Sequence, residues 1–242
     1  TGVINAVVPT TKRILNIFMG LFFVAGMVSC EKTTEGLTAI TYYPVIELNG
    51  GTEVIYLGET YVDPGCTAVM NGVDITDKVV VSDNIDNNSV GIYTVNYSAV
   101  NEQGFSASAS RTVYVVAESG IANLYVGSMT TPKGQVLSGG THLITDNGDG
   151  TYTLDDVMGG YYCWYTYPGY DAMGYDFFAE VDFSVDSDGV MTQVGDVGNW
   201  YFASQVELFI IDGQYDAGTG VVTFNTSYNG ATINVVLTPL TK

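Results

Sequence analysis

The sequence lacks the residues on which most catalytic and metal centres depend. It has a single histidine, His142, and three cysteines, so a zinc site built on several histidines is excluded within one chain. No G-x-S-x-G nucleophile elbow, H-E-x-x-H motif or glycine-rich phosphate loop with its lysine occurs. Adjacent carboxylates such as Asp155 and Asp156 do not indicate a glycosidase, since any chain with 26 acidic residues offers such pairs. We therefore predict a protein that is not an enzyme and needs no cofactor.

Basic residues are also scarce. Seven lysines and arginines oppose 26 acidic residues, and removal of residues 1–29 leaves five basic against 26 acidic residues, a net charge of −21. Such a surface repels nucleic acids and anionic lipid headgroups. Nucleic acid is therefore excluded as a partner. The charge by itself is typical of a soluble, exposed part of an exported protein.

Residues 12–30 have the pattern of an export signal. Lys12 and Arg13 precede an apolar run over residues 14–28, which is shorter than the about 20 residues of a transmembrane helix. Ser29 then places a small residue directly before Cys30. The segment resembles a bacterial lipoprotein signal, in which the cysteine becomes the first mature residue and carries the lipid. An ordinary signal peptide or an uncleaved anchor is the alternative.

This resemblance divides the N-terminal part of the chain. We expect residues 1–29 to comprise the signal peptide and the residues upstream of it, and residues 30–42 to form a lipidated tether. The acidic residues soon after Cys30 resemble the surface-export signals of Bacteroides-type lipoproteins. The likeness implies an outer-membrane lipoprotein of the cell envelope that is exposed on the surface and held to the membrane by its lipid.

Residues 43–117 show short strands with period-two alternation. Tyr93, Val95, Tyr97 and Ala99, for example, share one face of a predicted strand. Arg111 falls in the apolar phase of the strand at residues 106–116, so we expect it at the sheet rim or in an ion pair. About seven strands, with a turn signal every 8 to 12 residues, predict an Ig-like β-sandwich.

Four motifs in this region also resemble the Ig-like domain of bacterial surface proteins. They are TYVDPGCTA at 60–68, DITDKV at 74–79, GIYTVNY at 91–97 and RTV at 111–113. The resemblance implies a spacer or adhesive module without catalysis. Cys66 stands where a small residue is usual in the family, which favours a buried thiol.

Residues 118–242 predict a second all-β domain, an antiparallel β-sandwich or a flattened β-barrel. Turn signals at 146–150, 186–189, 216–218 and 229–230 separate strands of alternating pattern. The two domains together resemble small Bacteroides-type lipoproteins of unknown function, a likeness that transfers no site residues. Because Cys66 and Cys163 fall in separate predicted domains, we do not expect a disulfide between them.

Residues 159–175, GGYYCWYTYPGYDAMGY, have the strongest chemical character. Exposed tyrosine and tryptophan rings stack on the apolar faces of sugars, while neighbouring carboxylates and amides accept hydrogen bonds from hydroxyl groups. The alternative is that the rings fill the core of the second domain. The candidate ligand-binding residues, which include a second aromatic group, are Tyr162, Trp164, Tyr165, Tyr167, Tyr170, Trp200 and Tyr201.

Metal sites are not predicted. Residues 146–150, DNGDG, superficially resemble a calcium loop, but Gly148 occupies a ligand position and no glutamate completes twelve residues. A hairpin turn explains the segment better. His142, beside Leu143 and Ile144, is predicted to be a structural or edge residue of a strand.

Two functions follow from these features. We predict a cell-envelope accessory protein that binds a polysaccharide or oligosaccharide through the second domain, with the Ig-like domain as a spacer. The alternative is a structural or adhesive protein whose partner is another envelope protein.

Overall fold

The computed structural model describes residues 40–242 apart from 176, 199, 203–207 and 229. Cys30, the signal segment and most of the predicted tether lie outside the described residues. Over the part that is described, no helix is long and apolar enough to cross a membrane.

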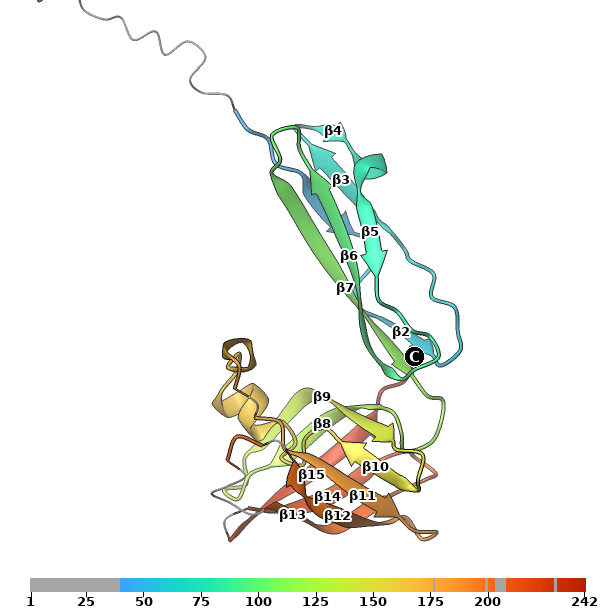
Figure 1. Cartoon of the computed structure of the whole chain (residues 1–242), viewed down its shortest axis with the longest axis vertical. Coiled ribbons are helices and arrows are strands. Elements are labelled where there is room, and N and C mark those ends of the chain that lie inside the picture. The colour runs from blue at the N-terminus through green and yellow to red at the C-terminus, as the bar shows by residue number, and fades with distance from the viewer. Residues whose placement is uncertain (1–39, 176, 199, 203–207, 229) are drawn as a thin grey trace, which may run out of the picture. The chain divides into compact units, whose positions relative to one another are not determined.

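The first domain is a sandwich of two β-sheets, as the sequence predicts (Figure 1). One sheet has the order β1-β3-β4 and the other the order β2-β7-β6-β5, in which β2 runs parallel to β7. A short 3-10 helix, η1 (Thr76–Lys78), precedes β5. The strands are β1 (Val45–Leu48), β2 (Glu53–Tyr56), β3 (Cys66–Met70), β4 (Val73–Asp74), β5 (Val80–Asp83), β6 (Gly91–Val100) and β7 (Ser106–Val116).

Alternation along β6 places the core residues as predicted. Val95, Tyr97 and Ala99 are buried, while Asn96 between them is exposed. Cys66 is buried against the same core, so the prediction of a buried thiol is confirmed.

The second domain is a closed antiparallel barrel of eight strands in the order β10-β11-β12-β13-β14-β15-β8-β9. Over the described residues, closure gives each strand of the barrel a paired neighbour on both sides. The structure therefore decides between the two predicted architectures in favour of the barrel. The strands are β8 (Leu124–Thr130), β9 (Val136–Asp146), β10 (Thr151–Leu154), β11 (Glu180–Val185), β12 (Val190–Gly198), β13 (Leu208–Tyr215), β14 (Val222–Tyr228) and β15 (Ala231–Pro239).

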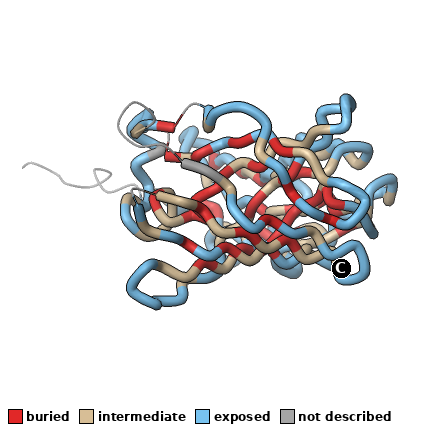
Figure 2. Tube along the Cα trace, turned by 90° about the horizontal axis from the view of Figure 1, so that it is seen from below, coloured by how far each residue is buried: buried red, intermediate tan, exposed pale blue. Residues whose placement is uncertain are grey.

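The barrel interior is filled by side chains. Val181 and Phe183 of β11 point into the core, and Glu180 and Asp182 point to solvent. Figure 2 shows the same division, with buried positions along the strands and exposed positions on the connecting loops. The DNGDG segment is the tight turn between β9 and β10, where the backbone N–H of Asn147 donates to the carbonyl oxygen of Thr151 at 3.1 Å.

One connection of the barrel is much longer than the turns. It joins β10 to β11 and carries a π-helix, η2 (Tyr161–Thr166), and a 3-10 helix, η3 (Asp171–Met173). It contains the whole aromatic stretch found in the sequence. This connection is therefore the part of the barrel that differs most from a plain strand meander.

Arg111 joins three segments of the first domain. Its side chain is fully buried and lies 3.7 Å from a Glu53 carboxylate oxygen and 3.9 Å from an Asp63 oxygen. Its Nη2 donates to the carbonyl oxygen of Gly65 at 2.9 Å, and its guanidinium carbon lies 5.8 Å from the centre of the Tyr97 ring. Arg111 is thus paired, which is one of the two outcomes that the sequence predicts.

Asp63 is held in its charged form within this network. Burial raises the pKa of its carboxyl, but hydrogen bonds from Tyr97 and from the Gly65 amide, with the charge of Arg111, outweigh burial and leave the pKa below its usual range. The Tyr97 hydroxyl donates to Asp63 at 2.5 Å. A buried arginine is therefore matched by an ionised partner rather than left alone.

Arg111→Met is expected to lower the free energy of unfolding of the first domain by about 2 kcal/mol. This loss is smaller than is usual for a broken buried ion pair, because the carboxylates of Glu53 and Asp63 are partly exposed. Hydrogen exchange of the β6 and β7 amides measures this loss. Lys78→Met, at an exposed position of the same domain, is the control. Equal protection in the two variants would show that the network does not stabilise the domain.

Candidate functional site

The buried carboxylate of Asp156 fixes both ends of the β10–β11 connection. It accepts hydrogen bonds from the amides of Met158 at 3.0 Å and Gly160 at 2.7 Å, near the start, and from Ala179 at 3.2 Å, near the end. Gly160 has φ +84°, a left-handed conformation that favours glycine, and it directly precedes η2. The sequence therefore sets where the π-helix begins.

Burial raises the pKa of Asp156 to about 6, although His142 and three backbone hydrogen bonds act in the opposite direction. The carboxylate is enclosed by the protein and occupied by amides. Its geometry is that of a structural anchor rather than of a general acid facing a substrate.

His142 lies in β9 and is completely buried. Its Nδ1 is 3.1 Å from Oδ1 of Asp155, whose other oxygen accepts the Leu143 amide at 2.9 Å. This pairing supports the structural role that the sequence predicts for His142.

Trp164 rests on two glycines and on His142. A Cβ atom at Gly140 would lie 1.8 Å from the indole ring, and one at Gly160 would lie 1.9 Å from it, so only glycine leaves room at either position. The indole contacts His142 edge to face, with ring centres 4.9 Å apart. Trp164 is half-buried, and its orientation is set by the backbone around it.

Tyr165 and Tyr167 are also half-buried. The hydroxyl of Tyr165 donates to the carbonyl oxygen of Ser138 at 2.6 Å. Tyr167 stacks on Phe177, with ring centres 4.7 Å apart and planes 20° from parallel. Both side chains are therefore partly committed to contacts within the barrel.

Two of the predicted ligand residues belong to the core instead. Tyr162 is 8% exposed and Trp200 is 3% exposed, and both pack in the main cluster of the barrel interior. The hydroxyl of Tyr162 is hydrogen-bonded to that of Tyr228. The π-helix turns Tyr162 inward, where it covers the apolar interior. The structure thus corrects the expectation that these two rings are available to a ligand.

The other predicted rings, Tyr170 and Tyr201, are exposed and lie next to a third. Tyr170 is 39% exposed, Tyr201 is 52% exposed, and Tyr175 between them is 40% exposed. Tyr175 is 5.9 Å from Tyr170 and 5.5 Å from Tyr201 between ring centres. Phe177 packs beneath all three, at 5.3 to 6.2 Å. We call Tyr170, Tyr175 and Tyr201 the tyrosine patch.

Tyr175 is outside the predicted ligand set, although it belongs to the same aromatic stretch. It lies two residues before Phe177, which the alternating pattern that leads into β11 assigns to the core. The two rings stack at 6.1 Å with planes 15° from parallel.

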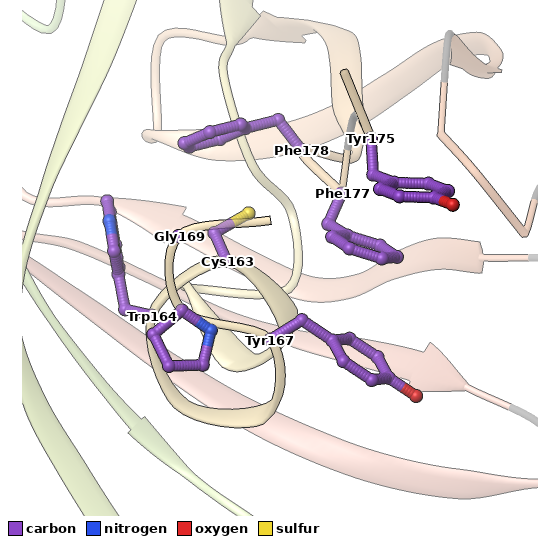
Figure 3. Close-up of a pocket in the computed structure, with 8 residues that line it drawn as sticks. Cys163, Trp164, Tyr167, Gly169, Tyr175, Phe177 and Phe178 are labelled. Atoms are coloured by element: carbon purple, nitrogen blue, oxygen red, sulfur yellow. The ribbon is translucent and has the colours of Figure 1, made fainter. Parts of the chain in front are cut away.

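A pocket of about 190 Å³ adjoins the patch (Figure 3). Tyr175 belongs to both, and Trp164 forms part of the pocket wall. Figure 3 shows the hydroxyl ends of Tyr167 and Tyr175 pointing away from Cys163 and Trp164. The described lining residues carry no charge; they are Cys163, Trp164, Tyr167, Pro168, Gly169, Tyr175, Phe177 and Phe178.

The domain that carries the site is strongly acidic. Residues 118–242 contain two basic residues, Lys133 and Lys242, against 15 acidic ones. In the described part of the chain, no group of three or more His, Cys, Asp or Glu side chains is arranged to hold a metal ion. The surface thus offers aromatic rings in an acidic surrounding.

Two family models match this chain. Residues 46–115 match the model of the bacterial surface protein Ig-like domain, and residues 115–239 match the BT2262-like C-terminal domain. The crystal structure of the lipoprotein BT2262 from Bacteroides thetaiotaomicron is 26% identical, with a TM-score of 0.55, over 82% of this chain and 100% of that one. Curated protein sequences give no match.

Two structures of Clostridium perfringens ZmpB are also similar at 15% identity. One contains CBM51-2 with GlcNAc and INT domains, with a TM-score of 0.26 over 81% of this chain and 44% of that one. The other contains the M60 catalytic domain with CBM51-1 and CBM51-2, with a TM-score of 0.27 over 82% of this chain and 21% of that one. At these TM-scores neither structure supports a conclusion about this chain.

Asp156 predicts a pH-dependent contribution to the stability of the barrel. Because its folded pKa lies above the unfolded value, this contribution is complete below about pH 4 and is lost as the pH rises through about 6. The free energy of unfolding of the wild type, minus that of Asp156→Asn, should therefore fall by on the order of 2–3 kcal/mol over this range. Urea unfolding followed by tryptophan fluorescence measures it.

Asp149→Asn is the matched control for this measurement. Hydrogen bonds from the Thr151 side chain and amide lower the pKa of the exposed Asp149. Its contribution is therefore present at neutral pH and is lost as the pH falls, which is the opposite sign. A difference for Asp156 that is flat, or that rises with pH, would contradict the assignment.

Proposed function

We propose, given that the chain belongs to the BT2262-like family, that it is a lipid-anchored protein of the cell envelope that binds glycans without catalysing a reaction. Its homologue is a Bacteroides lipoprotein, and its first domain is of a bacterial surface-protein type; both support a location in the cell envelope. In this proposal Cys30 carries the lipid at the outer membrane, and the Ig-like domain is the spacer that presents the barrel at the surface.

The tyrosine patch is the observation that carries glycan binding. Three adjacent rings remain 39% to 52% exposed, although the barrel has an aromatic core that could have buried them. Contiguous exposed apolar surface of this kind marks interaction sites. Tyrosine suits a sugar ligand because its ring stacks on the apolar face of the sugar while its hydroxyl stays in water.

The carboxylates near the aromatic connection support a binding role rather than catalysis. Asp156 is enclosed and bonded to three amides, and Asp155 is engaged by His142 and the Leu143 amide. A glycosidase needs two carboxyl groups that flank the bond to be broken. Asp156 faces the protein interior, and Asp155, whose side chain is 30% exposed, is bonded to His142 and to the backbone, so both support positioning of the loop.

The second candidate is an adhesive protein that binds another envelope protein. It is favoured by β5, an edge strand of the Ig-like domain on which Val80 is 66% exposed and Val81 is 47% exposed. An exposed edge strand can pair with a strand of a partner. Binding of an envelope protein that Val80→Lys abolishes and Tyr201→Ala leaves intact would favour this function.

Replacement of both Tyr170 and Tyr201 by alanine is expected to weaken glycan binding about tenfold, since each stacking contact contributes about 0.5–1.5 kcal/mol. Affinity electrophoresis against a panel of polysaccharides measures the loss. Tyr42→Ala, at a tyrosine outside the barrel that is 43% exposed, controls for the removal of an exposed ring. Wild-type protein that binds no glycan, or a double variant that binds as tightly, would refute the proposal.

Cys30→Ser is expected to move the protein from the membrane fraction of cells to the soluble fraction, because it removes the thiol that accepts the lipid. Incorporation of a labelled fatty acid, with partition into detergent, measures anchoring. Cys163→Ser retains the thiol at Cys30 and should remain anchored. Undiminished labelling of Cys30→Ser would show that this cysteine is not the lipid site.

A further inference from the structure

The pocket beside the tyrosine patch is too small for a glycan chain. Its volume of about 190 Å³ is below the about 300–1,000 Å³ of pockets that enclose drug-sized ligands. It can hold one substituent of a sugar, or at most one sugar unit. A glycan that lies across the patch would therefore enter the pocket with a side group rather than with its backbone.

The residues that line the pocket determine which kind of substituent it favours. They include the rings of Trp164, Tyr167, Phe177 and Phe178, and no described lining residue is charged. The Tyr167 and Tyr175 hydroxyls point away from Cys163 and Trp164 (Figure 3). A methyl group gains free energy when these rings remove it from water.

Tyr175 connects the two surfaces, because it is a member of the patch and also lines the pocket. A sugar ring stacked on Tyr175 is thus close enough to place a substituent against Trp164 and Phe178. These two rings meet edge to face with centres 6.0 Å apart. Since Trp164 is held by Gly140 and Gly160, this wall is formed before a ligand arrives.

The charge of the domain restricts the ligand further. Two lysines against 15 acidic residues in 118–242 repel uronic acids and sulfated sugars. The ligand that fits both the walls and the charge is therefore neutral and carries an apolar substituent.

We infer that the pocket binds the methyl-bearing substituent of a neutral sugar, either the acetamido group of an N-acetylhexosamine or the C6 methyl group of a 6-deoxyhexose. This inference rests on the proposed glycan binding and names its ligand class. The two sources share one chemistry, a methyl group enclosed by rings beside a stacked sugar, and the experiment below separates them.

The test is a comparison of dissociation constants for the full chain, measured by NMR titration. The probes are N-acetylglucosamine and N-acetylgalactosamine, L-fucose and L-rhamnose, glucose and galactose, and glucuronic acid. One enclosed methyl group is expected to improve affinity about fourfold over the plain hexose. Glucuronic acid should bind more weakly than glucose. Which of the methyl-bearing pairs binds more tightly identifies the source.

Phe178→Ala tests the position of the substituent, because it removes a ring of the pocket wall that is not part of the tyrosine patch. It should reduce the fourfold preference while plain hexoses still bind. Cys163 is left unchanged, because its Sγ donates to the Asp156 carboxylate at 4.0 Å. Thermal unfolding confirms that the variant is folded.

The outcomes separate this inference from the proposed function. Binding of hexoses that depends on Tyr170 and Tyr201, but with no preference for methyl-bearing sugars, overturns the inference and leaves glycan binding intact. A fourfold preference that persists unchanged in Phe178→Ala places the substituent elsewhere and also overturns the inference. Absence of binding to every probe and to the polysaccharide panel overturns both.

Discussion

The hydrogen bonds of Asp156 determine where the longest connection of the barrel begins and ends. Its carboxylate accepts the amides of Met158 and Gly160 on one side and of Ala179 on the other. A buried carboxylate is unfavourable unless its oxygens are bonded, so the chain is drawn together at this point. The π-helix, the pocket and two rings of the tyrosine patch all lie between these anchors. Their geometry therefore depends on the hydrogen bonds of one buried carboxyl group.

The aromatic residues of this connection serve two different purposes. Tyr162 turns inward and covers the end of the apolar interior, together with Trp200 and Phe177. Tyr170 and Tyr175 stay at the surface beside Tyr201. Phe177 joins the two groups, because it is buried itself and supports the exposed rings from below. Side chains that are held by a rigid core lose little conformational entropy when a ligand binds, so this arrangement suits a pre-organised binding site.

The few cationic side chains of the protein leave its surface acidic. Arg111 is the only arginine after Arg13, and it is buried in the first domain between Glu53 and Asp63. Its charge lies within the first domain and is not displayed at the surface. Anionic glycans would thus meet a surface on which carboxylates predominate. In the proposed function, a neutral sugar is not repelled by this field, and its apolar face stacks on the rings.

Local pattern determined much of this protein. Period-two alternation identified β6 and the inward face of β11, turn residues placed the hairpins, and the phase of β7 indicated that Arg111 needs a partner, because each of these depends on residues close in the chain. Family motifs identified the Ig-like domain. Which aromatic rings are exposed was decided only by the tertiary structure, since the 159–175 stretch has no regular period and its π-helix turns neighbouring rings in different directions. The tertiary structure also decided that the barrel closes, that Trp164 packs on Gly140 and that Tyr201 packs against Tyr175. Each of these contacts joins segments that are distant in the sequence and that only the closed sheet brings together.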